Sequence, residues 1–313
     1  MSTPLPTPKV RKFSASAAAQ LMQCPGSARL EQAIPGFIHP VRDDAAGAKG
    51  VGTRFHEQLY AVRALSPSEV NNYASILLSW SAQHYLKRYA QCDDPAKMRQ
   101  WLDAEYPSLR EPADVESIQH LIDWLCLMRE YPPKLLRWGV DALFVFSSIL
   151  QKAFRKLWAP MIHAEKSVQA SWLVGNYSTT PDVVVGADDT LWVLDYKTGK
   201  IPVSAVDNDQ LMYYAACYVA KDPSIERIKL IVSQPDNYST HAVRRADVLA
   251  WMEKAWEAER KILQGDLTLR PGDKCTFCPA YPHSRGDKGF PLCPVTSEML
   301  YPTRIDELAI LNI

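Results

Sequence analysis

Near the middle of the chain, two apolar segments separated by a short polar turn predict a β-hairpin. Residues 182–186 and 191–196 are rich in valine, leucine and tryptophan, and glycine, alanine and two aspartates lie between them. Short apolar runs bounded by turn residues are typical of strands. The pattern therefore predicts two antiparallel strands joined by a tight turn at 186–189.

The ends of this hairpin carry the first chemical signal. If Asp188 and Asp189 form the loop, Asp182 lies directly opposite Asp195, with Cβ atoms roughly 5 Å apart. Lys197 lies on the same face as Asp195. Two carboxylates this close repel each other unless a positive charge lies between them, and a divalent metal ion with oxygen ligands meets that need. The alternative, an acidic hairpin end with a surface lysine, leaves two aspartates on one face of apolar strands unexplained.

Elsewhere, segments with helical spacing of apolar residues alternate with segments of strand character. Helices are expected at 14–23, 66–89, 113–130, 207–218 and 245–264. Strands are expected at 160–170 and 227–235. Asp207 or Asp209 would cap the helix that contains Gln210. The apolar segment 141–158 fits either a helix or a strand.

The same pattern suggests one domain with an insertion. We expect residues 1–13 to form a flexible arm and residues 14–313 to form a single domain. Residues 61–157 show mainly helical periodicity, and we interpret them as a helical insertion that could flank a groove. Residues 271–295 form a separate segment in which three cysteines gather.

Cysteine spacing gives a second chemical signal. Seven cysteines is an odd number, and the chain shows no export signal, so a disulfide framework is not expected. Cys275 and Cys278 form a Cys-x-x-Cys knuckle typical of metal binding, and Cys293 follows 15 positions later. Zinc would need a fourth ligand, for which His283 is available. A [4Fe–4S] cluster would usually need four thiolates, and Cys24 could supply the fourth.

Composition limits the class of protein more than its function. The chain is 47% hydrophobic and 22% charged, which is ordinary for a globular protein. Its 35 basic and 35 acidic residues give zero net charge, which argues mildly against nucleic acid as a partner. It does not exclude nucleic acid, because a groove needs only local positive charge. No apolar run approaches the roughly 20 residues that span a bilayer, so we expect no membrane association and a cytoplasmic protein.

These residues together resemble a known family. Asp182, followed by Asp195-Tyr196-Lys197, resembles the Asp…(Asp/Glu)-x-Lys signature of the PD-(D/E)XK nuclease superfamily. Gly52-Thr53-x-x-His56 and Gln210-x-x-x-Tyr214 are similar to motifs of its RecB-like branch. One early cysteine and three near the C-terminus are similar to the iron–sulfur subgroup of that branch, which includes CRISPR-associated exonucleases.

The resemblance implies a fold and a metal site. The implied fold is a restriction-endonuclease-like α/β domain, with a central mixed sheet, flanking helices, a helical insertion and a cysteine-ligated cluster joining the N- and C-terminal parts. His56, Asp182 and Asp195 would bind Mg²⁺ or Mn²⁺, with Glu165 assisting, and Lys197 would act in catalysis.

It also implies roles for residues outside the carboxylate site. Gln210 and Tyr214 would contact DNA or support the active-site lysine. A [4Fe–4S] cluster would be held by four cysteines, Cys24, Cys275, Cys278 and Cys293. The last spacing is longer than is usual in that subgroup, which keeps Zn²⁺ as the alternative.

The implied function is metal-dependent hydrolysis of DNA phosphodiester bonds by a bacterial or phage-encoded protein. A free-standing chain of this size resembles phage-type exonucleases that resect linear duplex ends or single strands for recombination or repair. A single-strand annealing recombinase is the implied partner, and an oligomer is compatible with this function. The competing hypotheses are a non-catalytic DNA-binding or assembly module and a zinc-containing regulatory protein.

Overall fold

A mixed β-sheet forms the centre of the protein. The computed structural model describes residues 10–34, 133–157, 160–199, 201–281 and 292–296. Among these residues a five-stranded sheet has the order β1–β4–β5–β6–β7, with β5 parallel to β6 and the other neighbours antiparallel. Its strands are Met161–Ala164 (β1), Val183–Ala187 (β4), Thr190–Tyr196 (β5), Arg227–Gln234 (β6) and Asn237–Arg244 (β7). A separate small sheet contains Val168–Ala170 (β2) and Tyr177–Thr179 (β3).

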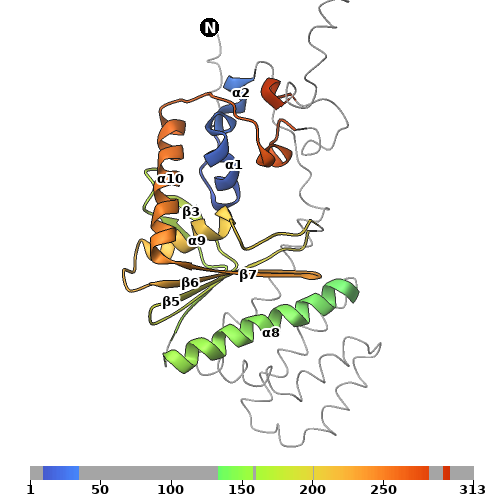
Figure 1. The fold of residues 1–313 in the computed structure, drawn as a ribbon, viewed down its shortest axis with the longest axis vertical. Helices are drawn as coiled ribbons and strands as arrows, with labels where there is room; N and C mark the ends of the chain where they lie inside the picture. The colour runs from blue at the N-terminus through green and yellow to red at the C-terminus, as the bar shows by residue number, and fades with distance from the viewer. Residues whose placement is uncertain (1–9, 35–132, 158–159, 200, 282–291, 297–313) are drawn as a thin grey trace, which may run out of the picture.

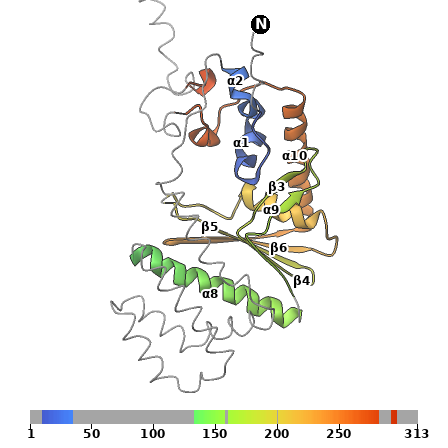
Figure 2. The same cartoon turned by 180° about the vertical axis from the view of Figure 1, so that it is seen from behind.

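Helices flank the central sheet on both sides (Figures 1 and 2). α8, Pro133–Lys156, runs across one face, and α9, α10 and α1 lie on the other side. The bounds of these three are Asp209–Val219 (α9), Arg245–Leu263 (α10) and Ala18–Gln23 (α1). Shorter helical segments are η1 (Ala15–Ala17), η2 (Pro25–Arg29), α2 (Leu30–Ala33) and η4 (Asp273–Phe277). The predicted mixed α/β architecture with flanking helices is therefore confirmed.

The central hairpin has the predicted register. Ala187 pairs with Thr190, which leaves Asp188 and Asp189 as the two-residue loop. Asp188 has a φ of 52°, the left-handed conformation that the common two-residue hairpin turns require. Every residue of β5 is buried, because helices cover both faces of this continuously apolar strand.

The segment 160–170, predicted as one strand, is two strands in different sheets. β1 ends at Ala164, and Glu165 follows with a φ of 46° before β2 begins at Val168. A positive φ turns the chain out of the extended conformation, whereas the alternating sequence pattern continues across the break. The ambiguous segment 141–158 is helical over its described part, up to the end of α8.

Two other differences concern α9 and β7. The predicted cap at Asp207 or Asp209 is wrong, because the Asn208 side chain accepts a hydrogen bond from the Leu211 amide at 3.1 Å. Asp207 has a φ of 53° and so lies outside the helix. β7 was not predicted, since its largely polar sequence forms an edge strand whose side chains alternate between partly buried and exposed.

The other predicted helices and strands are either confirmed or lie outside the described residues. The strand at 227–235 and the helix at 245–264 correspond to β6 and α10. The helices expected at 66–89 and 113–130 lie outside the described residues, as does most of the 1–13 arm. Within the described ranges, no helix is both long and apolar enough to cross a bilayer.

Candidate active site

Three acidic residues lie at the same level on neighbouring strands of the central sheet. The β1–β4 ladder ends with Ala164 opposite Val183, so the next step places Glu165 beside Asp182. The Glu165 amide donates to the Asp182 carbonyl at 2.8 Å. Continuing the β4–β5 register by one step places Asp182 opposite Asp195, as predicted. We call Glu165, Asp182 and Asp195 the carboxylate row.

The two aspartates of the row are almost completely buried. Asp195 is 1% exposed and Asp182 is 8% exposed, so each needs compensating partners. Asp182 accepts a hydrogen bond from the Tyr196 amide at 2.6 Å. Asp195 faces the Lys197 ammonium, whose Nζ lies 2.9 Å from Oδ2 and 3.2 Å from Oδ1. The positive charge that the sequence required beside these carboxylates is thus supplied in part by Lys197.

Gln210 connects the lysine, the carboxylate and helix α9. Its Oε1 accepts from Lys197 Nζ at 3.0 Å, and its Nε2 donates to Asp195 Oδ1 at 3.1 Å. The same amide nitrogen donates to the Tyr214 hydroxyl at 2.8 Å. Gln210 and Tyr214 are four residues apart, so they share one face of α9. The bonds to both Lys197 and Asp195 hold the lysine in a single position.

Burial and the neighbouring carboxylates keep the Tyr214 phenol neutral. Burial makes the largest contribution to raising the pKa of Tyr214, and the negative charges of Asp195, Asp182 and Glu165 raise it further. The hydrogen bond from Gln210 acts in the opposite direction and is outweighed. Asp195 lies on the α9 side of the sheet, where Gln210 of α9 bonds to it, and Asp182 lies opposite Asp195 in the register.

Other contacts that the sequence did not predict hold α9 in place. The Asn208 cap fixes the first turn, and Trp251 of α10 donates its indole N–H to Asp209 at 2.7 Å. A buried tryptophan usually finds a partner for its N–H, but the sequence gives no sign of which partner. Tyr196 lies on the opposite face, where its ring meets Trp138 of α8 edge-on at 6.2 Å between centroids.

The carboxylate row has the chemistry of a hard-cation site. Mg²⁺ and Mn²⁺ prefer carboxylate oxygens, and Asp182 and Asp195 present them from adjacent strands. Within the described part of the chain, however, no group of three or more His, Cys, Asp or Glu side chains is arranged to hold a metal ion as it stands. His56, the predicted imidazole ligand, lies outside the described residues.

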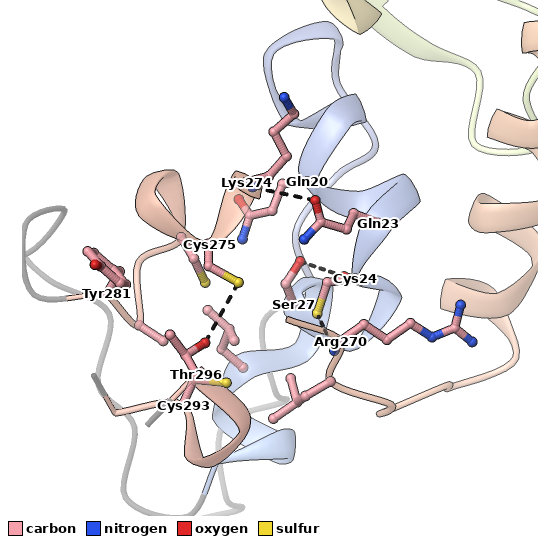
Figure 3. Close-up of a pocket in the computed structure, with 14 residues that line it drawn as sticks. Gln20, Gln23, Cys24, Ser27, Arg270, Lys274, Cys275, Tyr281, Cys293 and Thr296 are labelled. Atoms are coloured by element: carbon pink, nitrogen blue, oxygen red, sulfur yellow. Dashed lines mark hydrogen bonds between the residues drawn. The ribbon is translucent and has the colours of Figure 1, made fainter. Parts of the chain in front are cut away.

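The four predicted cluster cysteines line one pocket near the chain ends (Figure 3). Cys24 lies at the C-terminal end of α1, Cys275 lies in η4, and Cys278 caps η4. Cys293 joins them from the 292–296 segment. We call this site the cysteine pocket. The sulfurs do not form a ligand set in this arrangement, since the described residues contain no metal-holding group.

Polar contacts surround these sulfurs. The Arg270 amide donates to Cys24 Sγ at 3.3 Å, and the Thr296 hydroxyl contacts Cys275 Sγ at 3.7 Å. Burial, with a smaller contribution from the nearby thiols, raises the pKa of the Cys278 thiol to about 11. Sequence reasoning found the cysteines but missed Arg270 and Thr296, because no spacing rule links them to the knuckle.

The cysteine pocket joins the two ends of the described chain. The Gly26 amide donates to the Thr268 carbonyl at 3.2 Å, which ties η2 to the segment that follows α10. The pocket spans this junction. His283, the alternative zinc ligand, lies outside the described residues.

Fold and site together define a mixed α/β protein with a carboxylate–lysine site at one end of its central sheet. The chain belongs to the family described as "Protein of unknown function (DUF2800)", whose model matches residues 133–310. It is also similar to the solved structure titled "Crystal structure of SSO0001", with 14% sequence identity over 64% of this chain and 94% of that one, at a TM-score of 0.27. A function must therefore be argued from the site itself.

Proposed function

We propose that this protein is a metal-dependent deoxyribonuclease that acts on DNA ends as an exonuclease. The observation that carries the proposal is the carboxylate row beside a lysine that Gln210 and Asp195 hold in place. Burying carboxylates costs free energy, so a row of them is not expected in a sheet that serves only as a scaffold. A site that binds a cation and acts on an anionic substrate gives it one.

The residues of the row have distinct roles in this proposal. Asp182 and Asp195, with His56, would hold one or two Mg²⁺ or Mn²⁺ ions, and Glu165 would assist. Such an ion would lower the pKa of a water molecule and offset negative charge on the phosphate. Because the row lies across three strands, the ligands start from a rigid scaffold.

Lys197 supplies the group that acts on the reacting phosphate. Its side chain is 29% exposed, so it can reach a substrate while its partner Asp195 stays buried. A fixed positive charge next to the phosphate stabilises the negative charge that builds up in the transition state. Gln210 positions that charge from α9 and is also a proposed DNA contact, whereas the buried Tyr214 supports Gln210 through their hydrogen bond.

The choice of DNA ends as substrate comes from the family resemblance rather than from the site. We propose linear duplex ends or single strands as substrates, with a single-strand annealing recombinase as partner. The alternative is a non-catalytic DNA-binding or assembly module with the same fold. The paired Asp195 and Lys197 favour the enzyme, because a binding module has no need for a buried carboxylate at this position.

End-labelled linear DNA tests the proposal. Duplex and single-stranded substrates, labelled at either end, are incubated with Mg²⁺, Mn²⁺ or EDTA. We expect progressive shortening from an end with either metal and none with EDTA. Lys197→Ala should abolish cleavage in a protein that still folds by circular dichroism but melts at a lower temperature, because the buried Asp195 loses its charge partner. The exposed Lys254→Ala control on α10 should cleave and melt like the wild type. DNA that is retarded but intact in every lane would establish the binding module instead.

We further propose that the cysteine pocket holds a [4Fe–4S] cluster, with Zn²⁺ as the alternative. Four thiols in one pocket suit either group as a donor set. Iron, sulfide and zinc analysis of anaerobically purified protein distinguishes them. Cys278→Ser should lose the bound metal and unfold more readily, because the energy of binding a structural metal contributes to folding. Cys217→Ala, a buried cysteine in α9 outside the pocket, should retain the metal; equal loss in both variants would refute the assignment.

A further inference from the structure

A second, basic pocket lies on the face of the sheet opposite the carboxylate row. It has a volume of about 700 Å³, within the range of ligand sites. α8 contributes two lysines from its last two turns, and β6 and β7 contribute the other cations. The five basic residues that line it are Lys152, Lys156, Arg227, Lys229 and Arg244. We call this site the basic pocket.

Strand register explains why these side chains gather. Arg227 pairs with Arg244 across β6 and β7, and it pairs with Thr190 of β5 on its other side. Lys229 is opposite Trp192 in the next row on the same face. The face is the one that α8 covers, but α8 packs mainly on β4, so no described helix covers the β6–β7 part of the face beside the C-terminal end of α8.

The charge in this pocket is not balanced. Asp189 pairs with Arg227 at 2.6 Å and with Lys156 at 3.8 Å, which accounts for two of the cations. Lys152, Lys229 and Arg244 are exposed, and none of them has an ion-pair partner among the described residues. The only acidic residue in the described lining is Glu226. In a chain with zero net charge, this is a local concentration of positive charge that attracts anions.

The basic pocket is separate from the carboxylate row. Thr190 borders the pocket at one end of β5, and Asp195 lies near the other end on the opposite face. Five residues of strand span roughly 17 Å. A phosphate bound in the pocket therefore cannot be the one that meets Lys197.

We propose that the basic pocket binds the phosphodiester backbone of a nucleic acid, as a second contact remote from the carboxylate row. Three cations from α8, β6 and β7 have no ion-pair partner among the described residues, and their positions on three elements suit several phosphates in succession better than one. Trp192 lies beneath the Lys156 ammonium at 5.6 Å from its ring centre and is 5% exposed, so it offers no stacking surface for bases. Contacts to phosphates carry no sequence information, so this contact is expected to be independent of base sequence. It does not depend on the nuclease proposal, because binding here requires no cleavage.

Charge reversal tests this site in the full chain, with EDTA present so that cleavage does not interfere. The anisotropy of fluorescein-labelled single-stranded and duplex DNA is measured with Lys229→Glu/Arg244→Glu. The matched control is Lys12→Glu/Lys254→Glu, which makes the same change in net charge at exposed positions outside the pocket. We expect the pocket variant to bind about tenfold more weakly, with a salt dependence reduced by about two phosphate contacts. The control should stay close to wild type, and both variants should melt like the wild type.

Competitors identify the source of the phosphate. Unlabelled polynucleotide should displace the probe, whereas AMP, inorganic phosphate and polyglutamate should displace it only at far higher concentrations. Equal losses in the pocket and control variants, or no loss in the pocket variant, would overturn the site. Efficient displacement by AMP or polyglutamate would overturn the nucleic-acid backbone as its ligand. The pocket variant retains Lys197. Its cleavage of end-labelled DNA with Mg²⁺ therefore tests the nuclease proposal separately from the DNA binding measured here.

Discussion

At the scale of single residues, Gln210 joins groups that lie far apart in the sequence. Its amide accepts from Lys197 and donates to both Asp195 and Tyr214. The sequence showed Gln210 and Tyr214 only as a helical pair, which has little specificity alone. The contacts give the pair a physical role, since they fix a flexible lysine against a buried carboxylate.

Gln210→Leu is expected to lower the cleavage rate by about tenfold or more, because losing one oriented polar group at an active site costs a few kcal/mol of transition-state stabilisation. Stability should fall by about 1–3 kcal/mol, because Gln210 makes three hydrogen bonds and the buried Asp195 loses one of its partners. Single-turnover cleavage and urea unfolding give the two values. Gln169→Leu, at an exposed position of β2, is the control. A Gln210→Leu enzyme with the wild-type rate would show that Lys197 needs no positioning from α9.

At the scale of elements, the sequence predicted the β4–β5 hairpin but not the elements that pack beside it. β4 and β5 pair through a local turn, so spacing alone sets Asp182 opposite Asp195. Glu165 joins the same row only because β1 packs beside β4, a pairing across many intervening residues. The Asn208 cap depends on the left-handed conformation of Asp207, which has no clear signal among several neighbouring polar residues.

The junction of η2 with the segment after α10 should be sensitive to one methyl group. A Cβ added at Gly26 would lie 2.6 Å from the Leu267 carbonyl oxygen and 2.7 Å from that of Thr268. Both are backbone atoms, so Gly26→Ala must push the two segments apart. We expect a destabilisation of about 1–3 kcal/mol, typical of overpacking, measured by urea unfolding.

Gly199→Ala is the matched control, because none of the described residues lies within 4 Å of its added Cβ. It should be neutral or slightly stabilising. If Gly26→Ala unfolds at the same urea concentration as this control, the close approach of the two segments is not part of the folded state. If the proposed metal occupies the cysteine pocket, the Gly26 variant should also retain less of it, because Cys24 lies two residues away.

At the scale of the whole molecule, buried tyrosines connect the α9 layer to its neighbours. Tyr213 is fully buried, donates to the Phe13 carbonyl at 3.0 Å and packs against Trp172 and Trp251. Sequence periodicity placed α9 and α10 as helices, but it did not show that the N-terminal segment packs against both of them. That packing depends on contacts about 200 residues apart in the chain, which no local pattern encodes.

Because these tyrosines are buried, we expect the protein to lose stability at alkaline pH. Burial raises the pKa values of Tyr213, Tyr214 and Tyr218 above the ordinary value of about 10. Above pH 10 the unfolded chain loses these phenol protons while the folded chain keeps them, so the unfolded state binds fewer protons. Stability must then fall as pH rises through this range, whereas below pH 10 the contribution is fully present.

Ultraviolet tyrosinate absorbance and circular dichroism, recorded together from pH 9 upward, test this linkage. We expect the exposed tyrosines to ionise first and the buried ones to ionise together with the loss of helix signal. Tyr213→Phe removes one of the linked groups, so its stability should fall less steeply above about pH 10 than that of the wild type. If all tyrosines ionise as one class near their ordinary pKa while the helix signal persists, solvent reaches the α9 layer and the buried network around Tyr214 is not closed. The same experiment therefore tests the environment that surrounds the carboxylate row, independently of any cleavage assay.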